Sequence, residues 1–360
     1  MAASLVCPDC GETYDAGPGE PWQCTCGHPL DFAERPLPDG PPETLGVARG
    51  LWAFEDFLPI EPHVTLGEGW TPLADAPAWD ATFKLEYVLP SGSFKDRGAT
   101  ATLSRAVELG VDRVVEDSSG NAGAAIAQYA ARAGVEADIY VPAGAKESKL
   151  KAIRRVGATP VPIEGTRQDV TDACVAAVEA GDAWYASHAW NPAFFAGTAT
   201  FAVELAAQRD WSVPDAVVVP LGHGTLFLGA YRGFTALRDA GWTDSVPRLL
   251  GVQAAGVAPI AAALNEDADG PINDVADGIQ ITDPVRQKQI LDAVDDTGGD
   301  AIAIGEAATE AALTALHERG FYVEPTSAIA VAGLEAYRER GVLSTDDDVV
   351  VPLTGSGLKY

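Results

Sequence analysis

From about residue 81 onward, short apolar runs rich in β-branched residues alternate with segments of helical periodicity. The runs are bounded by Gly or Pro, as buried strands often are, and they include residues 112–117, 137–142, 159–164, 215–222, 248–253 and 348–355. Between them lie helical segments, several of which end in glycine, at residues 122–134, 147–157, 225–241, 307–320 and 327–341. This alternation over most of the chain predicts an α/β fold whose parallel sheets are covered by helices on both faces.

Composition narrows the class of partner. The formal net charge is −28, from 24 Lys and Arg against 52 Asp and Glu, and such a surface repels nucleic acid and anionic membranes. No apolar run is long enough for a membrane span, and the N-terminus lacks the basic-then-apolar pattern of a secretory signal. We therefore expect a cytoplasmic protein without a nucleic-acid or membrane partner, and we interpret its acidic surface as halophilic.

Four of the five cysteines lie in the first 26 residues, in the patterns C-x-x-C-G and C-x-C-G. Two glycine-marked turns of this kind can close a tetrahedral site of four thiolates, and a reducing cytosol disfavours disulfides. We expect structural zinc on Cys7, Cys10, Cys24 and Cys26. The alternative is a redox or vestigial cluster without metal. Residues 1–30 are thus predicted to form a zinc-ribbon-like segment, and the Pro- and Gly-rich residues 31–66 a linker.

The stretch SGSFKDRGA places Lys95 where a helix begins, with Ser93 available as its cap. A lysine at a helix start opposes the macrodipole, so it needs a local anion or a chemical role. A partly buried lysine has a lowered pKa and can form a Schiff base. The alternative is an exposed lysine that pairs with Asp96 or Glu86.

Three further strand ends carry residues that can bind a ligand, because parallel sheets bind ligands at the carboxyl ends of their strands. Ser118, Ser119, Gly120 and Asn121 open a helix and can seat a carboxylate or phosphate, although an ordinary capped turn looks the same. Gly222, His223, Gly224 and Thr225 can cradle a phosphate, in a loop that fits neither the Walker nor the G-x-G-x-x-G pattern. The Thr354 hydroxyl can hydrogen-bond a ring nitrogen. A lysine, an anion seat, a phosphate cradle and a neutral ring-nitrogen partner together fit pyridoxal phosphate.

Residues 67–360 resemble the fold-type II pyridoxal-phosphate enzymes, and within them the threonine synthase family. The resemblance is carried by GEGWTPL (67–73), SGSFKDRGA (91–99), SSGNAGAAIAQYAARAG (118–134), EPTSA (324–328) and TGSGLK (354–359), and archaeal-type members also carry an N-terminal cysteine knuckle pair. It implies two open, mostly parallel sheets. A larger cofactor-binding domain would comprise residues 67–95 and 206–360, and a smaller mobile domain residues 96–205.

The resemblance also implies roles for individual residues. Lys95 would be the Schiff-base lysine and proton shuttle, Phe94 would lie against the ring, and Asn121 would hold the ring's 3′ oxygen. The turn from Ser118 through Gly120 would take the substrate carboxylate, and Thr354 would face the pyridine nitrogen. The cofactor phosphate would be bound by Gly222, His223, Gly224 and Thr225, where the family usually has a Gly-Asn-x-Gly-Asn type of loop.

The implied reaction converts O-phospho-L-homoserine and water to L-threonine and phosphate. We expect Ser91, Ser93 and Arg97 to meet the substrate phosphate, since a planar guanidinium can grip it bidentately. Arg97 could instead form a structural ion pair. Two alternatives of the same fold remain open, a serine/threonine ammonia-lyase and a β-replacing synthase acting on phosphoserine or a similar amino acid. A non-catalytic, ribbon-bearing binding protein is the alternative from another class, and a homodimer remains open.

Overall fold

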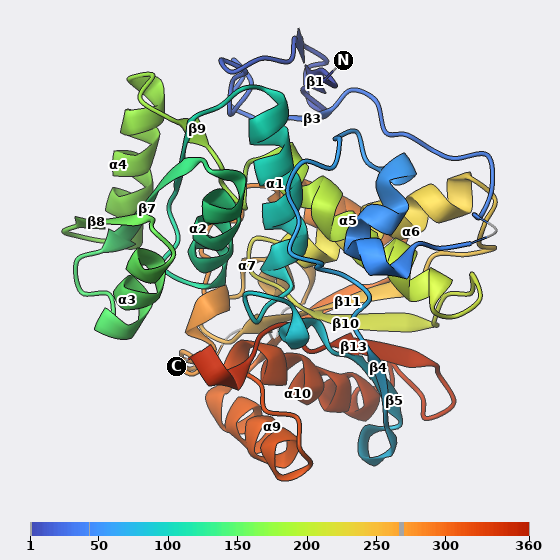
Figure 1. Cartoon of the computed structure of the whole chain (residues 1–360). Helices are drawn as coiled ribbons and strands as arrows, with labels where there is room; N and C mark the ends of the chain where they lie inside the picture. The colour runs from blue at the N-terminus through green and yellow to red at the C-terminus, as the bar shows by residue number, and fades with distance from the viewer. Residues whose placement is uncertain (1, 43, 266–269, 360) are drawn as a thin grey trace. The chain divides into compact units, whose positions relative to one another are not determined.

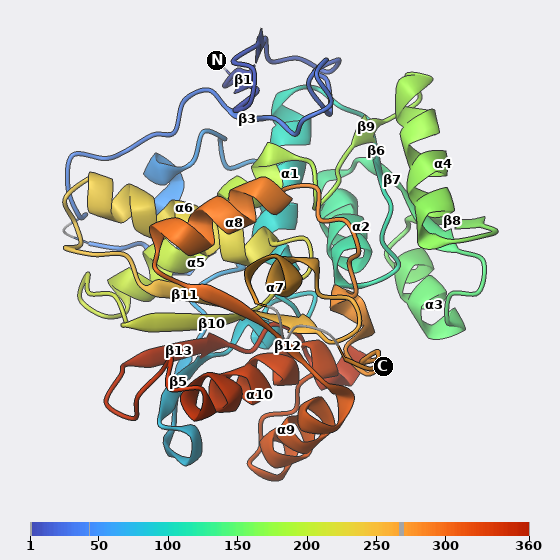
Figure 2. The same cartoon turned by 180° about the vertical axis from the view of Figure 1, so that it is seen from behind.

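The computed structural model describes residues 2–42, 44–265 and 270–359 (Figures 1 and 2). The chain divides into two compact units. Unit 1 comprises residues 2–69 and Lys95–Thr200, and unit 2 comprises Trp70–Phe94 and Phe201–Lys359. Each unit has its own sheet, its own covering helices and its own hydrophobic core. These features confirm the predicted α/β class with two mostly parallel sheets.

Unit 2 contains a six-stranded sheet with the strand order β12-β11-β10-β13-β5-β4. The strands are β4 (Leu73–Ala76), β5 (Ala81–Lys84), β10 (Ala216–Pro220), β11 (Arg248–Ala254), β12 (Asp300–Ile304) and β13 (Val349–Pro352). All neighbours are parallel except β4 and β5. The β-branched run Val217–Val219 is buried on both sides, which is why this strand has no polar face.

Helices cover both faces of this sheet. In Figures 1 and 2, α10 packs along one face of β10 and β11, whereas α6 and α8 lie on the other. The α-helices are α6 (Thr225–Asp239), α7 (Pro259–Leu264), α8 (Gln287–Asp296), α9 (Glu306–Glu318) and α10 (Pro325–Glu339). Among the described residues of this unit there are also four short 3₁₀-helices: η2 (Pro77–Trp79), η3 (Glu86–Val88), η4 (Asp277–Ile279) and η5 (Gly357–Lys359).

Unit 1 contains a four-stranded, all-parallel sheet with the order β8-β7-β6-β9. Its strands are β6 (Arg113–Glu116), β7 (Glu136–Pro142), β8 (Thr159–Ile163) and β9 (Trp184–Tyr185). α2 packs on one face of β7 and α4 on the other (Figure 1). The helices are α1 (Lys95–Glu108), α2 (Asn121–Ala133), α3 (Glu147–Arg155), α4 (Arg167–Glu179) and α5 (Pro192–Ala207), the last of which belongs to unit 1 as far as Thr200.

The N-terminal residues form a small antiparallel sheet with the order β2-β1-β3. Its strands are β1 (Leu5–Val6), β2 (Thr13–Tyr14) and β3 (Asp31–Phe32), and the 3₁₀ segment η1 (Val47–Phe57) follows. Leu5, Phe32 and Trp52 share one hydrophobic cluster with Ala101 of α1 and Ala193 of α5. Residues 31–66, which we expected to be a linker, therefore include segments that pack into the core of unit 1. No helix among the described residues has the length and apolar character that crossing a membrane requires.

Candidate active site

Lys95 is the first residue of α1 and is partly buried. One turn later Gly98 permits a close approach, because a Cβ at this position would overlap the ring of Phe194 on α5. Residues three apart on a helix lie on the same face, so Phe194 packs against the face that begins at Lys95. The sequence placed the start of this helix correctly, but its partner helix α5 lies about one hundred residues further along the chain.

Arg97 has no exposed surface, and its Nη1 donates to Thr200 Oγ1 at 3.3 Å. It therefore connects α1 to α5 inside unit 1. Its guanidinium is covered by protein, whereas the sequence led us to expect a side chain that meets a substrate phosphate.

In unit 2, the turn before Lys95 is hydrogen-bonded to the C-terminal loop. Phe94 N–H donates to the carbonyl of Thr354 at 3.0 Å, and Ser356 N–H donates to the carbonyl of Gly92 at 2.9 Å. Ser93 and Gly355 form an antiparallel bridge between these two bonds. The structure thus brings together three of the predicted site positions, Ser93, Phe94 and Thr354, with Ser91 in the same turn and its Oγ 3.5 Å from Ser93 Oγ.

Ser327, at the start of α10, lies in the same place and was not among the predicted site residues. Its Oγ is 3.1 Å from Thr354 Oγ1 and accepts a hydrogen bond from Gly355 N–H at 2.7 Å. Ser327 and Thr354 are both buried. The signal was present in the motif EPTSA, which carried the family resemblance without a role for its serine. The Ser327 hydroxyl donates to the carbonyl of Gly355 at 3.1 Å, so the Thr354 hydroxyl stays the predicted neutral partner for a ring nitrogen, with Ser327 beside it.

The loop Gly222–Thr225 lies between the end of β10 and the start of α6 in unit 2. Gly224 is the N-cap of α6 and has a left-handed backbone with φ 77°, which favours glycine. The first N–H groups of a helix have no carbonyl partner within the helix, so they point outward as an anion site. Thr225 is buried at the first helical position, whereas His223 is only partly buried. This donor set fits a phosphate group.

The turn Ser118–Asn121 has the corresponding place in unit 1, between β6 and α2. Ser118 Oγ accepts a hydrogen bond from Gly120 N–H at 3.2 Å, and Asn121 is the first residue of α2. All four residues are partly exposed. A small-residue turn at a helix N-terminus fits the predicted carboxylate seat.

A buried carboxylate and imidazole flank this turn, and the sequence did not predict them. Glu116 ends β6, and its Oε1 lies 2.7 Å from Nδ1 of His188, while its Oε2 accepts the His188 backbone N–H at 3.2 Å. Burial raises the pKa of Glu116 well above its usual value, and burial together with the positive charge of Lys95 lowers the pKa of His188 to about 3. His188 follows β9 as Glu116 ends β6, and these two strands are neighbours. The available signal was that one of only five histidines in the chain lies three residues after an aromatic strand.

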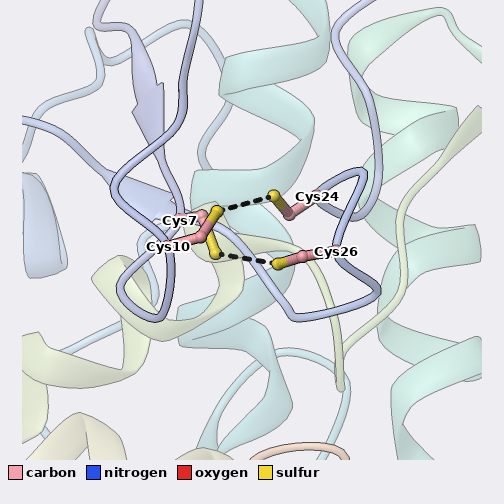
Figure 3. Close-up of side chains that lie close together, drawn as sticks. All are labelled: Cys7, Cys10, Cys24 and Cys26. Atoms are coloured by element: carbon pink, nitrogen blue, oxygen red, sulfur yellow. Dashed lines mark hydrogen bonds between the residues drawn. The ribbon is translucent and has the colours of Figure 1, made fainter.

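The four N-terminal cysteines converge (Figure 3). Their sulfur atoms all lie within 4.8 Å of one another, with Cys7 Sγ 3.6 Å from Cys26 Sγ and Cys10 Sγ 3.4 Å from Cys24 Sγ. Four ligands at Zn–S distances of about 2.3 Å place tetrahedral sulfurs about 3.8 Å apart. Desolvation raises the pKa of Cys24, but hydrogen bonds from the Cys26 backbone and the Tyr14 hydroxyl outweigh it and lower that pKa to about 6. The set therefore fits a tetrahedral thiolate metal site.

The segment between the two cysteine pairs is anchored to the rest of unit 1. Glu20 Oε2 accepts a hydrogen bond from Arg105 Nη2 on α1 at 2.7 Å, and both side chains are almost fully buried. Trp22 makes edge-to-face contacts with Tyr185 and Trp190, at ring-centroid distances of 5.7 and 4.7 Å. The predicted metal ligands are therefore adjacent in sequence to side chains that pack on α1 and β9.

Comparison with known proteins gives consistent matches. Residues 64–355 match the family model described as "Pyridoxal-phosphate dependent enzyme". The chain is 33% identical over 374 residues to threonine synthase of Methanocaldococcus jannaschii, with 98% of this chain and 92% of that protein covered. It is 36% identical over 324 residues to threonine synthase of Methanosarcina acetivorans, with 86% and 80% covered. Among solved structures it is similar to an L-serine ammonia-lyase from Rhizomucor miehei, with a TM-score of 0.66, 26% identity, and 79% of this chain and 93% of that chain covered.

Proposed function

Because the chain belongs to the family of pyridoxal-phosphate-dependent enzymes, we propose that it is a threonine synthase. The reaction converts O-phospho-L-homoserine and water to L-threonine and inorganic phosphate. The observation that carries this assignment is the identity of 33% to a threonine synthase over 98% of the chain, which includes the cysteine-bearing N-terminus. The expected resemblance to this family and the expected lyase activity are thereby confirmed.

Both units offer donors that fit the cofactor. In unit 1 the Lys95 amine is proposed to hold it covalently, and the side-chain amide of Asn121 to bind its ring oxygen. In unit 2 the N–H groups from Gly222 to Thr225 are proposed to bind its phosphate, and Thr354, with Ser327 beside it, its ring nitrogen. Phe94 is proposed to lie against its ring. When bound, the cofactor would accept the negative charge that develops at the substrate α-carbon.

The remaining steps fall to the chain's own side chains. The Lys95 amine is proposed to remove the α-proton of the substrate and to return protons later in the reaction. The turn Ser118–Gly120, at the N-terminus of α2, is proposed to hold the substrate carboxylate so that the α-carbon stays fixed. Ser91 and Ser93 are proposed as donors to the substrate phosphate. Arg97 stays a predicted donor, although its burial and its bond to Thr200 favour a role in holding α1 to α5.

The experiment that tests the proposal is a product assay on purified holoenzyme. We expect release of phosphate from O-phospho-L-homoserine with formation of threonine, and no release of ammonia from L-serine or L-threonine. The serine/threonine ammonia-lyase remains the second candidate, because a solved L-serine ammonia-lyase shares the fold at 26% identity. Ammonia release from serine or threonine, without turnover of O-phosphohomoserine, would establish that candidate instead. Phosphate release from phosphoserine would favour the β-replacing synthase.

We further propose that the four N-terminal cysteines hold one structural zinc ion, because their sulfurs have nearly the spacing of a tetrahedral thiolate site. Four protein ligands leave no position for substrate, so the ion is not proposed to take part in the reaction. The cytoplasmic location, the homodimer and the halophilic character stay predictions from the sequence.

A further inference from the structure

The pair formed by Glu116 and His188 lies at the carboxyl ends of two neighbouring parallel strands, where such sheets place their ligands. The side chain of Glu116 has no exposed surface and that of His188 is 9% exposed. His188 holds both carboxylate oxygens, one through Nδ1 at 2.7 Å and the other through its backbone N–H at 3.2 Å. A buried ionisable pair is costly to maintain, so its presence beside the Ser118–Asn121 turn calls for an explanation.

Phe194 links the pair to the first turns of α1. The imidazole of His188 makes a T-shaped contact with the ring of Phe194, at a centroid distance of 6.1 Å. Phe194 in turn fills the space over Gly98, one helical turn from Lys95. The ring of Phe194 therefore lies between the imidazole of His188 and the helix face that carries Lys95, and all three residues belong to unit 1.

Three charged groups act on the pair. Lys95 and Arg167 contribute positive charge, and Asp117 contributes negative charge. Asp117 is itself held by the hydroxyls of Thr171 and Tyr185, at 2.6 and 2.9 Å. Burial disfavours an imidazolium at His188, whose pKa falls to about 3, so the charge of the pair changes at Glu116. Of the two cations, Lys95 is the one whose own protonation changes in the proposed reaction.

We propose that Glu116 and His188 are a positioning pair for the proton on the Lys95 nitrogen, in which the negative charge of Glu116 favours the protonated nitrogen. When the Lys95 nitrogen carries a proton, Glu116 is a carboxylate that accepts from His188. When the nitrogen loses its proton to solvent, this attraction is lost and the proton affinity of Glu116 rises. The coupling is electrostatic and requires no bond between the pair and Lys95. The inference rests on the proposed role of Lys95, but not on the identity of the substrate.

Substitutions at the pair should shift the pH at which the Lys95 nitrogen loses its proton. Glu116→Gln removes the carboxylate, so the protonated nitrogen loses a favourable charge and its titration midpoint should fall by about one pH unit, a tenfold change in the proton dissociation constant. His188→Leu removes the donor to the carboxylate and should shift the midpoint in the same direction. His188→Asn keeps an N–H donor close to the position of Nδ1 and should leave the midpoint near that of the wild type.

The measurement is a pH titration of the visible absorbance of the holoenzyme without substrate, which follows the proton on the nitrogen that holds the cofactor. Glu108→Gln is the matched control, because the same change is made at the far end of α1, about 20 Å along the helix from Lys95. Circular dichroism checks that each variant is folded. If Glu116→Gln does not accumulate as folded holoenzyme, the titration midpoint of His188→Leu is compared with that of His188→Asn, and the inference predicts a lower midpoint in His188→Leu.

The inference is overturned if the titration midpoints of Glu116→Gln and His188→Leu equal the midpoint of Glu108→Gln. It is also overturned if the midpoint lies beyond the titrated pH range in all three variants. A shift toward higher pH overturns it as well. Each of these results would reduce the pair to a structural bridge between β6 and the segment after β9. Failure of the proposed reaction is a separate outcome, because this titration contains no substrate.

Discussion

Replacing Lys84 by methionine should destabilise unit 2 more than any single surface substitution. Lys84 is fully buried on β5, and its Nζ donates to Glu204 Oε1 at 2.6 Å, to Gln208 Oε1 at 2.8 Å and to the carbonyl of Thr71 at 3.2 Å. Glu204 also has no exposed surface, and it accepts the backbone N–H groups of Trp70 and Thr71 at 2.7 and 2.8 Å. The pair therefore fixes the start of the segment that leads into β4.

The magnitude follows from leaving one charge buried without its counter-charge. Breaking a buried ion pair by removing one partner costs about 3–5 kcal/mol, and Lys84→Met leaves the Glu204 carboxylate in that position. Glu204→Gln should cost a similar amount, because it leaves the Lys84 ammonium. The double variant contains neither charge, so its loss should be smaller than the sum of the single losses by about 2 kcal/mol or more.

Urea unfolding of the holoenzyme, followed by far-ultraviolet circular dichroism, measures these free energies from the shift of the transition. Lys288→Met is the control, since Lys288 pairs with Asp292 on the exposed face of α8 with the two side chains 81% and 61% exposed. It should leave the transition unchanged. Single-variant losses below about 1 kcal/mol, or strictly additive losses, would refute the reasoning that this pair is a desolvated ion pair.

Three other outcomes are expected. Lys95→Ala should abolish turnover and covalent attachment of the cofactor while the circular dichroism spectrum stays that of the wild type, and residual activity above a few per cent would contradict the assignment. Gly98→Ala should force Phe194 away from α1, lower kcat and destabilise unit 1 by about 1–3 kcal/mol, and a variant with wild-type kcat and stability would show that the contact is not tight. Elemental analysis of untagged protein should find about one zinc per chain. Removal of the zinc by a chelator should change the fluorescence of Trp22, which packs on Tyr185, without abolishing turnover. Absence of zinc, or loss of all activity in Cys7→Ser, would exclude a purely structural metal site.

Much of the fold followed from local pattern. The run DAVVVPLG predicted β10 and RLLGVQ predicted β11, each to within a residue or two, because buried parallel strands are uniformly apolar and end at Gly or Pro. α5 was not predicted. Its sequence PAFFAGTATFAVELAA has no polar face, since it is surrounded by protein, so no amphipathic period marks it as a helix.

The residues of the candidate site likewise divide into those that a local sequence pattern marks and those that it does not. Lys95 and the turn at Ser118–Asn121 were identified because each has a local signature at a helix start. Glu116 and His188 are 72 residues apart, and Lys84 and Glu204 are 120 apart, so only the folded chain brings the members of each pair together. The chemistry of its side chain suggested Arg97 as a phosphate donor. The sequence did not reveal that packing against α5 buries this side chain completely.

The position of β13 affects how the protein can be made in the cell. This strand is translated after every other strand of its sheet, yet it lies between β10 and β5, in register with Val217 on one side and Phe83 on the other. During synthesis β4 and β5 therefore lack β13, the strand that joins them to β10, while more than two hundred further residues emerge from the ribosome. From the synthesis of β10 until β13 follows, more than one hundred residues later, the nascent chain presents the unpaired edge of the valine-rich β10, a surface on which other chains can pair. Rapid closure by β13, or protection by a chaperone until it arrives, is thus a requirement that the strand order places on the cell.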